Sequence, residues 1–166
     1  MNSGCTKYCV DTSALILWWS DSYSPDVFET IPDRMAALIV EGRLLTSRSV
    51  KDEIKDSSDP DEFTLAKWCR AQSGFYVEDD PDVQKIVRTL NDTYQNPPKK
   101  KGKGIRGADP FVIARAEILG SDWCVVSAER TSNGSNFNPN IPYVCEARDI
   151  EHIEFYDLMK REGWKL

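Results

Sequence analysis

The sequence has little histidine, and its cysteines form no metal-binding or redox motif. The one histidine among the 166 residues is His152, and no Ser or Cys motif lies near it, so a catalytic nucleophile–histidine triad is not indicated. The five cysteines are odd in number, widely spaced and without a Cys-x-x-Cys pair. This pattern argues against a disulfide framework or a zinc site. We expect the cysteines to be unpaired small hydrophobic residues.

Long apolar runs are also missing. No stretch approaches the roughly 20 apolar residues of a membrane span, and the first residues lack the basic and apolar regions of a secretory signal. Hydrophobic residues make up 40% of the chain and aromatic residues 10%, which is ordinary for a globular protein. We therefore expect a single domain spanning residues 1–166 in the cytoplasm, with no membrane partner.

Excess positive charge is absent as well, with one local exception. The net charge is −6, so the surface as a whole does not attract nucleic acid. Residues 96–106 form a basic, Pro/Gly-rich run that predicts an irregular loop. The run ends in a G-x-G-x-x-G pattern at 102–107, but no strand precedes it, so the dinucleotide fingerprint fails its context test. No Walker A sequence is present.

Apolar periodicity and turn signals predict alternating strands and helices. The expected strands are Tyr8–Val10, Leu44–Thr46, Gly74–Val77, Trp123–Ser127 and His152–Phe155, with a strand-to-helix passage at Ala14–Trp19. The expected helices are Asp33–Arg43, Ser49–Lys55, Pro60–Ala71, Pro81–Tyr94, Pro110–Leu119 with Asp109 as its N-cap, Pro142–Arg148 and Asp157–Glu162. This alternation predicts an α/β fold whose parallel sheet has helices on both faces.

Four acidic residues lie where these strands end or these helices begin. Asp11 and Glu129 follow expected strand ends, and Glu53 and Asp109 lie in the opening turns of expected helices. Ligands of parallel sheets bind outside the carboxyl ends of the strands, where the strand order reverses. The four carboxylates are therefore expected at one rim.

Each of these residues also has an ordinary structural explanation. Asp11 and Asp109 could be helix N-caps, with Pro110 following Asp109 at the first helical position. Glu53 could be a solvated helical carboxylate, and Glu129 could pair with Arg130 or face water. Carboxylates that converge on one rim, however, must stay partly protonated or hold a cation. Oxygen ligands without His or Cys favour Mg²⁺ or Mn²⁺ over zinc.

Four segments together resemble the PIN-domain superfamily across almost the whole chain: Tyr8–Leu15, Ser49–Ile54, Gly107–Ala116 and Val125–Glu129. The C-terminal stretches 141–147 and 159–164 resemble one bacterial and archaeal branch of free-standing, VapC-like members. The resemblance implies a three-layer α/β/α sandwich and a metal-dependent nuclease. By position it assigns the metal-binding and catalytic acids to Asp11, Glu53, Asp109 and Glu129, and a supporting polar role to Ser13. The fourth acid is more often Asp, so Glu129 departs from the common pattern.

The resemblance further implies RNA as substrate, Mg²⁺ or Mn²⁺ as cofactor, a cognate antitoxin and a homodimer. The basic run could grip a nucleic-acid backbone without reading bases, through Lys99, Lys100, Lys101, Lys103 and Arg106. Two other functions stay open. One is a PIN-fold interaction module with weak or no catalysis, and the other is a metal-dependent DNA nuclease or phosphatase.

Overall fold

The computed structural model describes residues 4–55, 59–95, 104–130 and 133–166. Its strands are β1 (Lys7–Val10), β2 (Leu44–Ser47), β3 (Tyr76–Val77), β4 (Trp123–Ser127) and β5 (His152–Glu154). Its helices are α1 (Thr12–Ile16), the π-helix η1 (Leu17–Ser22), α2 (Ile31–Val40), α3 (Arg48–Lys55), α4 (Pro60–Ala71), α5 (Pro81–Thr93), α6 (Asp109–Leu119), α7 (Ile141–Ala147) and α8 (Phe155–Arg161).

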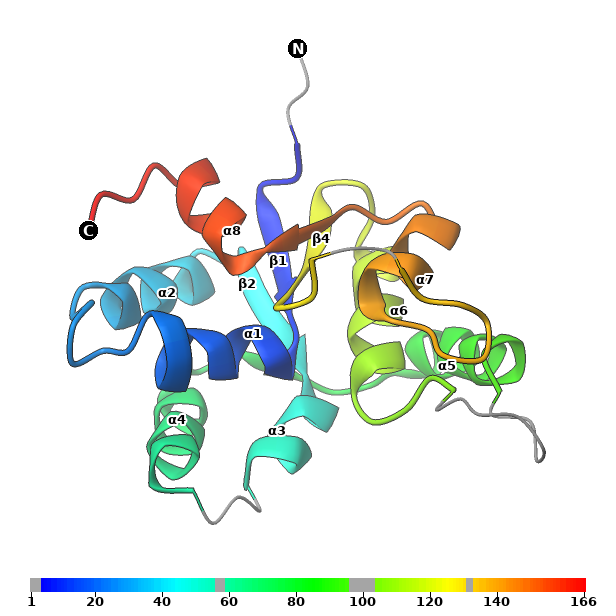
Figure 1. The fold of residues 1–166 in the computed structure, drawn as a ribbon, viewed down its shortest axis with the longest axis horizontal. Coiled ribbons are helices and arrows are strands. Elements are labelled where there is room, and N and C mark those ends of the chain that lie inside the picture. Colours follow the sequence, from blue (N-terminus) through cyan, green and yellow to red (C-terminus); the bar gives the residue numbers. More distant parts are fainter. Residues whose placement is uncertain (1–3, 56–58, 96–103, 131–132) are drawn as a thin grey trace.

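In the part of the chain that the structure describes, the strands form one five-stranded sheet in the order β3-β2-β1-β4-β5, and every neighbouring pair is parallel. Helices α5, α6 and α7 lie on one side of the sheet, and α1, α2, α4 and α8 lie on the other (Figure 1). This three-layer arrangement confirms the expected α/β/α sandwich. No described helix is both long and apolar enough to cross a membrane.

The strand order reverses between β1 and β4. The chain adds β2 and β3 on one side of β1, then crosses to add β4 and β5 on the other. Val10 of β1 is in register with Val126 of β4. Asp11, directly after β1, therefore lies beside Ser127, the last residue of β4. A crevice at such a reversal is where parallel sheets bind ligands.

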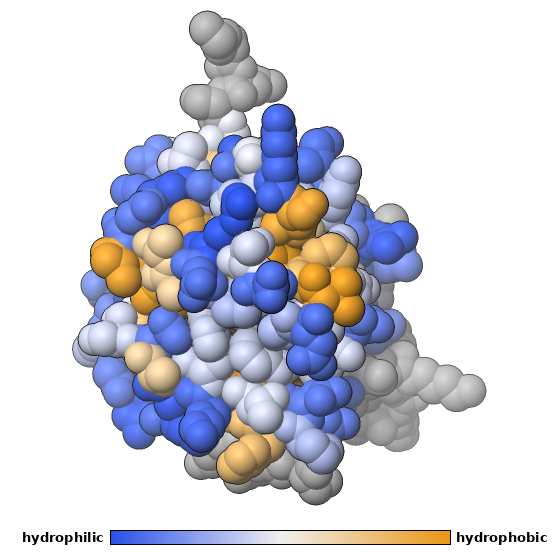
Figure 2. Space-filling view, turned by 90° about the vertical axis from the view of Figure 1, so that its left-hand side faces the viewer, coloured by the Kyte–Doolittle hydropathy of each residue, from blue (hydrophilic) through white to orange (hydrophobic). Residues whose placement is uncertain are grey.

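The core is continuous across the sheet and includes the aromatic residues of the first helices. Trp18 of η1 is completely buried, stacks on Phe155 and meets Trp68 edge-on at a ring separation of 4.9 Å. Trp19 and Tyr23 are partly buried against the same core. On the side of the molecule that Figure 2 shows, apolar surface residues are separated by hydrophilic ones and do not merge into one apolar face.

Some element boundaries differ from the sequence-based expectation. The last strand was expected to run to Phe155, with a helix from Asp157, but α8 begins at Phe155. A reciprocal cap explains the early start, because Asp157 accepts a hydrogen bond from the Glu154 N–H at 3.1 Å while Glu154 caps the first turn. Helix α3 likewise starts one residue before Ser49, whose N–H donates to the Ser47 hydroxyl.

The expectation that all five cysteines are unpaired is wrong for two of them. Cys5 and Cys124 form a disulfide across a sequence separation of 119, while Cys9, Cys69 and Cys145 are free and buried. Cys5 lies just before β1 and Cys124 lies on β4, so parallel pairing of these strands brings the two together. Sequence spacing alone gives no sign of this proximity.

Candidate active site

Asp11 is fixed at the start of α1 by both its backbone and its side chain. Its N–H donates to the Val126 carbonyl at 2.9 Å, which extends the pairing of β1 with β4. Its Oδ2 accepts from the Ser13 N–H at 3.1 Å and from the Ser13 hydroxyl at 2.7 Å, so the expected N-cap role is confirmed. Asp11 is only 3% exposed, and its Oδ1 is buried with no hydrogen-bond partner among the described residues.

Ser13 ties this cap to the neighbouring strand. While its hydroxyl donates to Asp11, the same oxygen accepts from the Ala128 N–H at 3.1 Å. Ala128 follows the end of β4 directly. Ser13 therefore joins the carboxyl ends of β1 and β4 through one side chain.

Asp109 is not the N-cap that its position before Pro110 predicts. The cap is Ala108, and Asp109 is the first residue of α6, with Pro110 second. Proline is accepted at either of the first helical positions because those N–H groups have no partner within the helix, so the dipeptide does not fix the start. The Asp109 carboxylate is half-buried.

Glu53 lies in the second turn of its helix, as the sixth residue of α3, and not in the expected opening turn. Its Oε1 accepts from the Ala108 N–H at 2.6 Å, and its Oε2 accepts from the Thr12 hydroxyl at 2.5 Å. Gly107 makes this approach possible, since a Cβ built there would stand 2.6 Å from Glu53 Oε1 and its φ is +62°. Glu53 is exposed, yet it links the starts of α1 and α6 and is not simply solvated.

Glu129 follows β4 and is held by neighbouring backbone. Its N–H donates to the Ser127 hydroxyl at 3.1 Å, and its Oε2 accepts from the Ile141 N–H at 2.7 Å at the start of α7. Arg130 pairs with Glu154 at 3.2 Å, so the alternative of a Glu129–Arg130 pair is not what the structure has.

The four carboxylates influence one another electrostatically. Burial, together with the charges of Asp11, Glu129 and Glu53, raises the pKa of Asp109 to about 8 against the opposing charge of Arg106. Burial, with a smaller contribution from the charge of Glu53, raises the pKa of Asp11 to about 6, although the hydrogen bonds from Ser13 oppose the shift. Asp109 therefore lies within reach of the fields of all three other acids.

A complete set of metal ligands is not assembled in the described residues. Among them, no three His, Cys, Asp or Glu side chains are grouped as a metal site would require. Glu53 and Glu129 each accept a hydrogen bond from a backbone N–H. In the same described part of the chain, the buried Asp11 Oδ1 has no hydrogen-bond partner. The carboxylates are close enough to interact, and Asp11 and Asp109 are the more buried members.

Most of the basic run lies outside the described residues, including Lys99, Lys100, Lys101 and Lys103. Arg106 is described; its side chain is exposed, and its positive charge lowers the pKa of Asp109. Of the five basic residues named in that run, Arg106 is the one that the structure places at the rim.

Sequence reasoning missed several residues that shape the site. The Ser127 hydroxyl accepts from the Glu129 N–H and shares a hydrogen bond of 2.6 Å with His152 Nε2. Burial lowers the pKa of His152 to about 4, which keeps the ring neutral at pH 7. Thr12 and Gly107 were also missed, although the Asp-Thr-Ser and Gly-Ala-Asp triplets place them beside the acids.

Fold and site together define a three-layer α/β/α protein with four interacting carboxylates at the carboxyl-end edge of a parallel sheet. Residues 8–166 match the family described as Domain of unknown function (DUF4411), and the chain belongs to that family. A comparison with curated proteins found no match.

Proposed function

We propose that this protein is a metal-dependent endoribonuclease whose active site is the acidic rim. One observation carries the proposal: the buried Asp11 and the half-buried Asp109, 98 positions apart in the sequence by their numbers, interact electrostatically at the strand-order reversal, and both have raised pKa values. Perturbed carboxylates in such a crevice are typical of functional sites. The resemblance to PIN domains supplies the reaction class.

The donor set fits a hard divalent cation. A buried carboxylate oxygen without a partner is costly, and Asp11 Oδ1 has none among the residues that the structure describes. A second carboxylate nearby adds repulsion that a cation relieves. Oxygen ligands favour Mg²⁺ or Mn²⁺, with Asp11 and Asp109 as the primary ligands and Glu53 and Glu129 contributing directly or through water.

The residues around the acids orient them for this role. Ser13 donates a hydrogen bond to Asp11 Oδ2, whereas Asp11 Oδ1 has no hydrogen-bond partner among the described residues. Backbone N–H groups of Ala108 and Ile141 hold Glu53 and Glu129 at the rim. When bound, a divalent ion lowers the pKa of a coordinated water and neutralises charge on the scissile phosphate. Arg106, and the lysines before it in the sequence, would attract the phosphate backbone.

The finer assignments follow from the resemblance. We propose RNA as the substrate, a cytoplasmic location, and a cognate antitoxin that silences the enzyme, with a homodimer as the assembled form. None of these depends on the metal-ligand assignment.

The test is cleavage of labelled RNA and DNA by the purified protein, with Mn²⁺ or with chelator. We expect RNA cleavage that requires Mn²⁺ and falls at least about 100-fold in Asp11→Asn and in Asp109→Asn. Asp82→Asn is the matched control, since Asp82 is an exposed acid in the first turn of α5.

Each other result has a definite meaning. Cleavage at the wild-type rate in both variants would contradict the proposal. Cleavage of DNA alone would indicate a DNA nuclease, and no cleavage of either polymer by folded protein would favour an interaction module.

A further inference from the structure

A cavity of about 360 Å³ opens directly beside the acidic rim. Asp109 and Glu129 form part of its wall, and much of the remainder comes from Arg106 and from the segment 133–140 that joins β4 to α7. Its volume is at the lower end of the range of small-molecule pockets, about 300–1,000 Å³. A group bound here would adjoin whatever the carboxylates act on.

The loop wall of this cavity is held in place by its own hydrogen bonds. Asn140 accepts from the Tyr143 N–H at 3.0 Å and donates to Asn133 Oδ1 at 2.8 Å. The Asn138 N–H donates to the Ser135 hydroxyl at 3.2 Å, and the Ser135 N–H donates to the Asn138 carbonyl at the same distance. These bonds fix the segment on the start of α7.

Two further contacts lock the same wall. The Gly104 N–H donates to the Phe137 carbonyl at 3.0 Å, which joins the chain before α6 to the loop. Gly134 packs so closely that a Cβ built there would stand 2.7 Å from the backbone nitrogen of Asn140. The wall is therefore preformed, which reduces the entropy lost when a ligand binds.

Not all polar groups of the wall are used by the fold. Within the described residues, the side-chain amide of Asn138 makes no hydrogen bond, and the Asn133 amide uses only its oxygen. Both side chains belong to the cavity lining. An asparagine amide offers one donor and one acceptor side by side, which matches the hydrogen-bonding edge of a nucleobase.

The charged residues of the lining fit a base with its adjoining phosphate. Glu129 repels an anion but accepts hydrogen bonds from amino and imino groups of a base, and Arg106 can contact the phosphate that follows that base. Sequence-specific recognition of RNA works in this way, by hydrogen bonds to the edges of unstacked bases in single strands.

We infer that this cavity receives one nucleobase of a single-stranded RNA, next to the scissile phosphate, and that the Asn138 amide reads its edge. The inference rests on the proposed ribonuclease function and gives it a sequence preference. Asn138 acts as a specificity-determining residue, and Asn133 offers a second donor.

Cleavage-site sequencing tests this inference. A pool of random single-stranded RNA is digested with Mn²⁺ by wild-type protein, by Asn138→Ala and by the control Asn91→Ala, whose amide is exposed on α5 away from the cavity. We expect wild type to prefer certain bases at one fixed position beside the cut. Asn138→Ala should weaken that preference about 10-fold while still cutting, and Asn91→Ala should keep it. An unchanged preference in Asn138→Ala, or no preference in wild type, would overturn the inference and leave the nuclease proposal standing.

A binding measurement keeps the inference testable if RNA is not cut. The four nucleosides, which carry no phosphate, are titrated into metal-free full-length protein while side-chain amide resonances are followed by NMR. We expect at least one nucleoside to shift the Asn138 and Asn133 resonances of the wild type, and the Asn133 shift to be lost in Asn138→Ala. If no nucleoside shifts them at millimolar concentration, the cavity does not take a base, whatever the catalytic result.

Discussion

Asp109 is the residue whose environment opposes its charge most clearly. Burial and three neighbouring carboxylates raise its pKa to about 8, and Arg106 compensates only in part. An aspartate in an unfolded chain has a pKa near 3.9. The folded, metal-free protein therefore binds a proton at Asp109 that the unfolded chain releases over most of the range between these values.

The sign of the resulting pH dependence is fixed by this difference. Because the folded state binds more protons than the unfolded state between about pH 4 and pH 8, stability falls as pH rises through this window. Asp109→Asn removes the titration. We expect the variant to exceed wild type in unfolding free energy by about 2 kcal/mol at pH 8 in chelator, with the gap closing towards pH 4.

Chemical denaturation at a series of pH values measures this effect. Asp82→Asn serves as control, because it removes an exposed carboxylate from a helix start without a carboxylate cluster. A constant gap between Asp109→Asn and wild type across the series would show that the acidic rim does not destabilise the fold. Added Mn²⁺ should stabilise wild type more than the variant, since it binds the native carboxylates.

A carboxylate of α3 reaches the start of α6. Glu53 accepts from the Ala108 N–H just before α6, and the neighbouring Gly107 leaves the necessary room. Gly107 also has φ +62°, a conformation that costs other residues roughly 1–2 kcal/mol. Gly107 therefore has to provide both a positive φ and the space that Glu53 occupies.

Gly107→Ala should therefore cost more than a comparable substitution elsewhere. Gly42 has φ +71° but nothing within 4 Å of an added Cβ, so Gly42→Ala isolates the backbone cost of about 1 kcal/mol. We expect Gly107→Ala to destabilise by about 1–2 kcal/mol more, because the methyl group forces Glu53 Oε1 away from the Ala108 N–H and breaks that hydrogen bond.

A double-mutant cycle separates the two contributions. In a Glu53→Ala background the collision is gone, so Gly107→Ala should cost no more than Gly42→Ala when both are measured by urea unfolding. If Gly107→Ala costs the same extra amount with and without Glu53, the side-chain contact is not the cause.

Most elements were predictable because each has a strong local signal. The helix Pro60–Ala71 and the strand Trp123–Ser127 match expectation at both ends. A proline marks the start of the helix, and a short run of buried apolar residues marks the strand. The early start of α8 was missed because a reciprocal Glu154–Asp157 cap depends on side-chain geometry. The Asp109 position was missed because proline fits either of the first two helical residues.

The site was predictable only in outline. Parallel topology places the residues after β1 and β4 at one edge, which is why Asp11 and Glu129 could be expected together. Their partners could not be expected, because the Ile141 N–H, the Ala108 N–H and the Ser127–His152 bond depend on contacts between distant segments. The same holds for the Asn138 amide, which makes no hydrogen bond within the described part of the chain and whose place in the loop wall depends on the fold.

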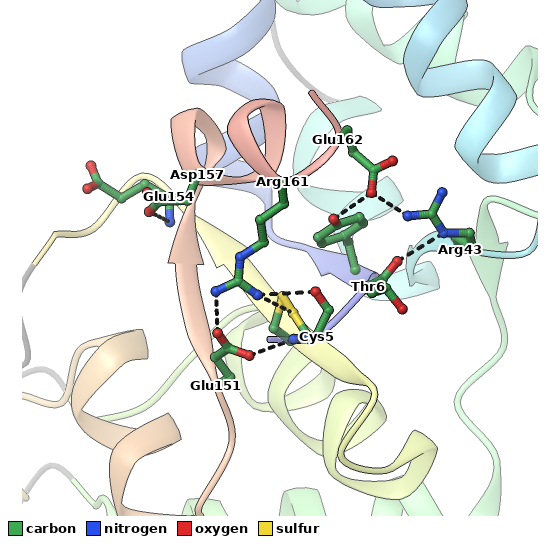
Figure 3. The surroundings of a disulfide bond; sticks show 10 residues. Cys5, Thr6, Arg43, Glu151, Glu154, Asp157, Arg161 and Glu162 are labelled. Atoms are coloured by element: carbon green, nitrogen blue, oxygen red, sulfur yellow. Dashed lines mark hydrogen bonds and ion pairs between the residues drawn. A yellow bond between two sulfur atoms is a disulfide. The ribbon is translucent and has the colours of Figure 1, made fainter. Parts of the chain in front are cut away.

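At the opposite edge of the sheet, the two ends of the chain are fastened together. Cys5 is bonded to Cys124 of β4, and its N–H donates to Glu151 at 2.9 Å (Figure 3). Arg161 of α8 pairs with Glu151 and donates to the Cys5 carbonyl at 3.1 Å. The segment before β1 is thereby held to β4 and to α8, far along the chain from it.

Reducing this disulfide should lower the stability of the whole molecule. Opening a loop of this length restores entropy to the unfolded chain, worth up to about 5 kcal/mol in the loop-closure estimate. Wild type should therefore unfold at a lower urea concentration with reductant than without it, while a Cys5→Ala, Cys124→Ala double variant should show no response to reductant. Alkylation of the unfolded chain should label three thiols before reduction, those of Cys9, Cys69 and Cys145, and all five cysteines afterwards. Five labelled thiols without reductant would contradict the bond, and the N-terminal segment would then depend on Arg161 and Glu151 for its attachment.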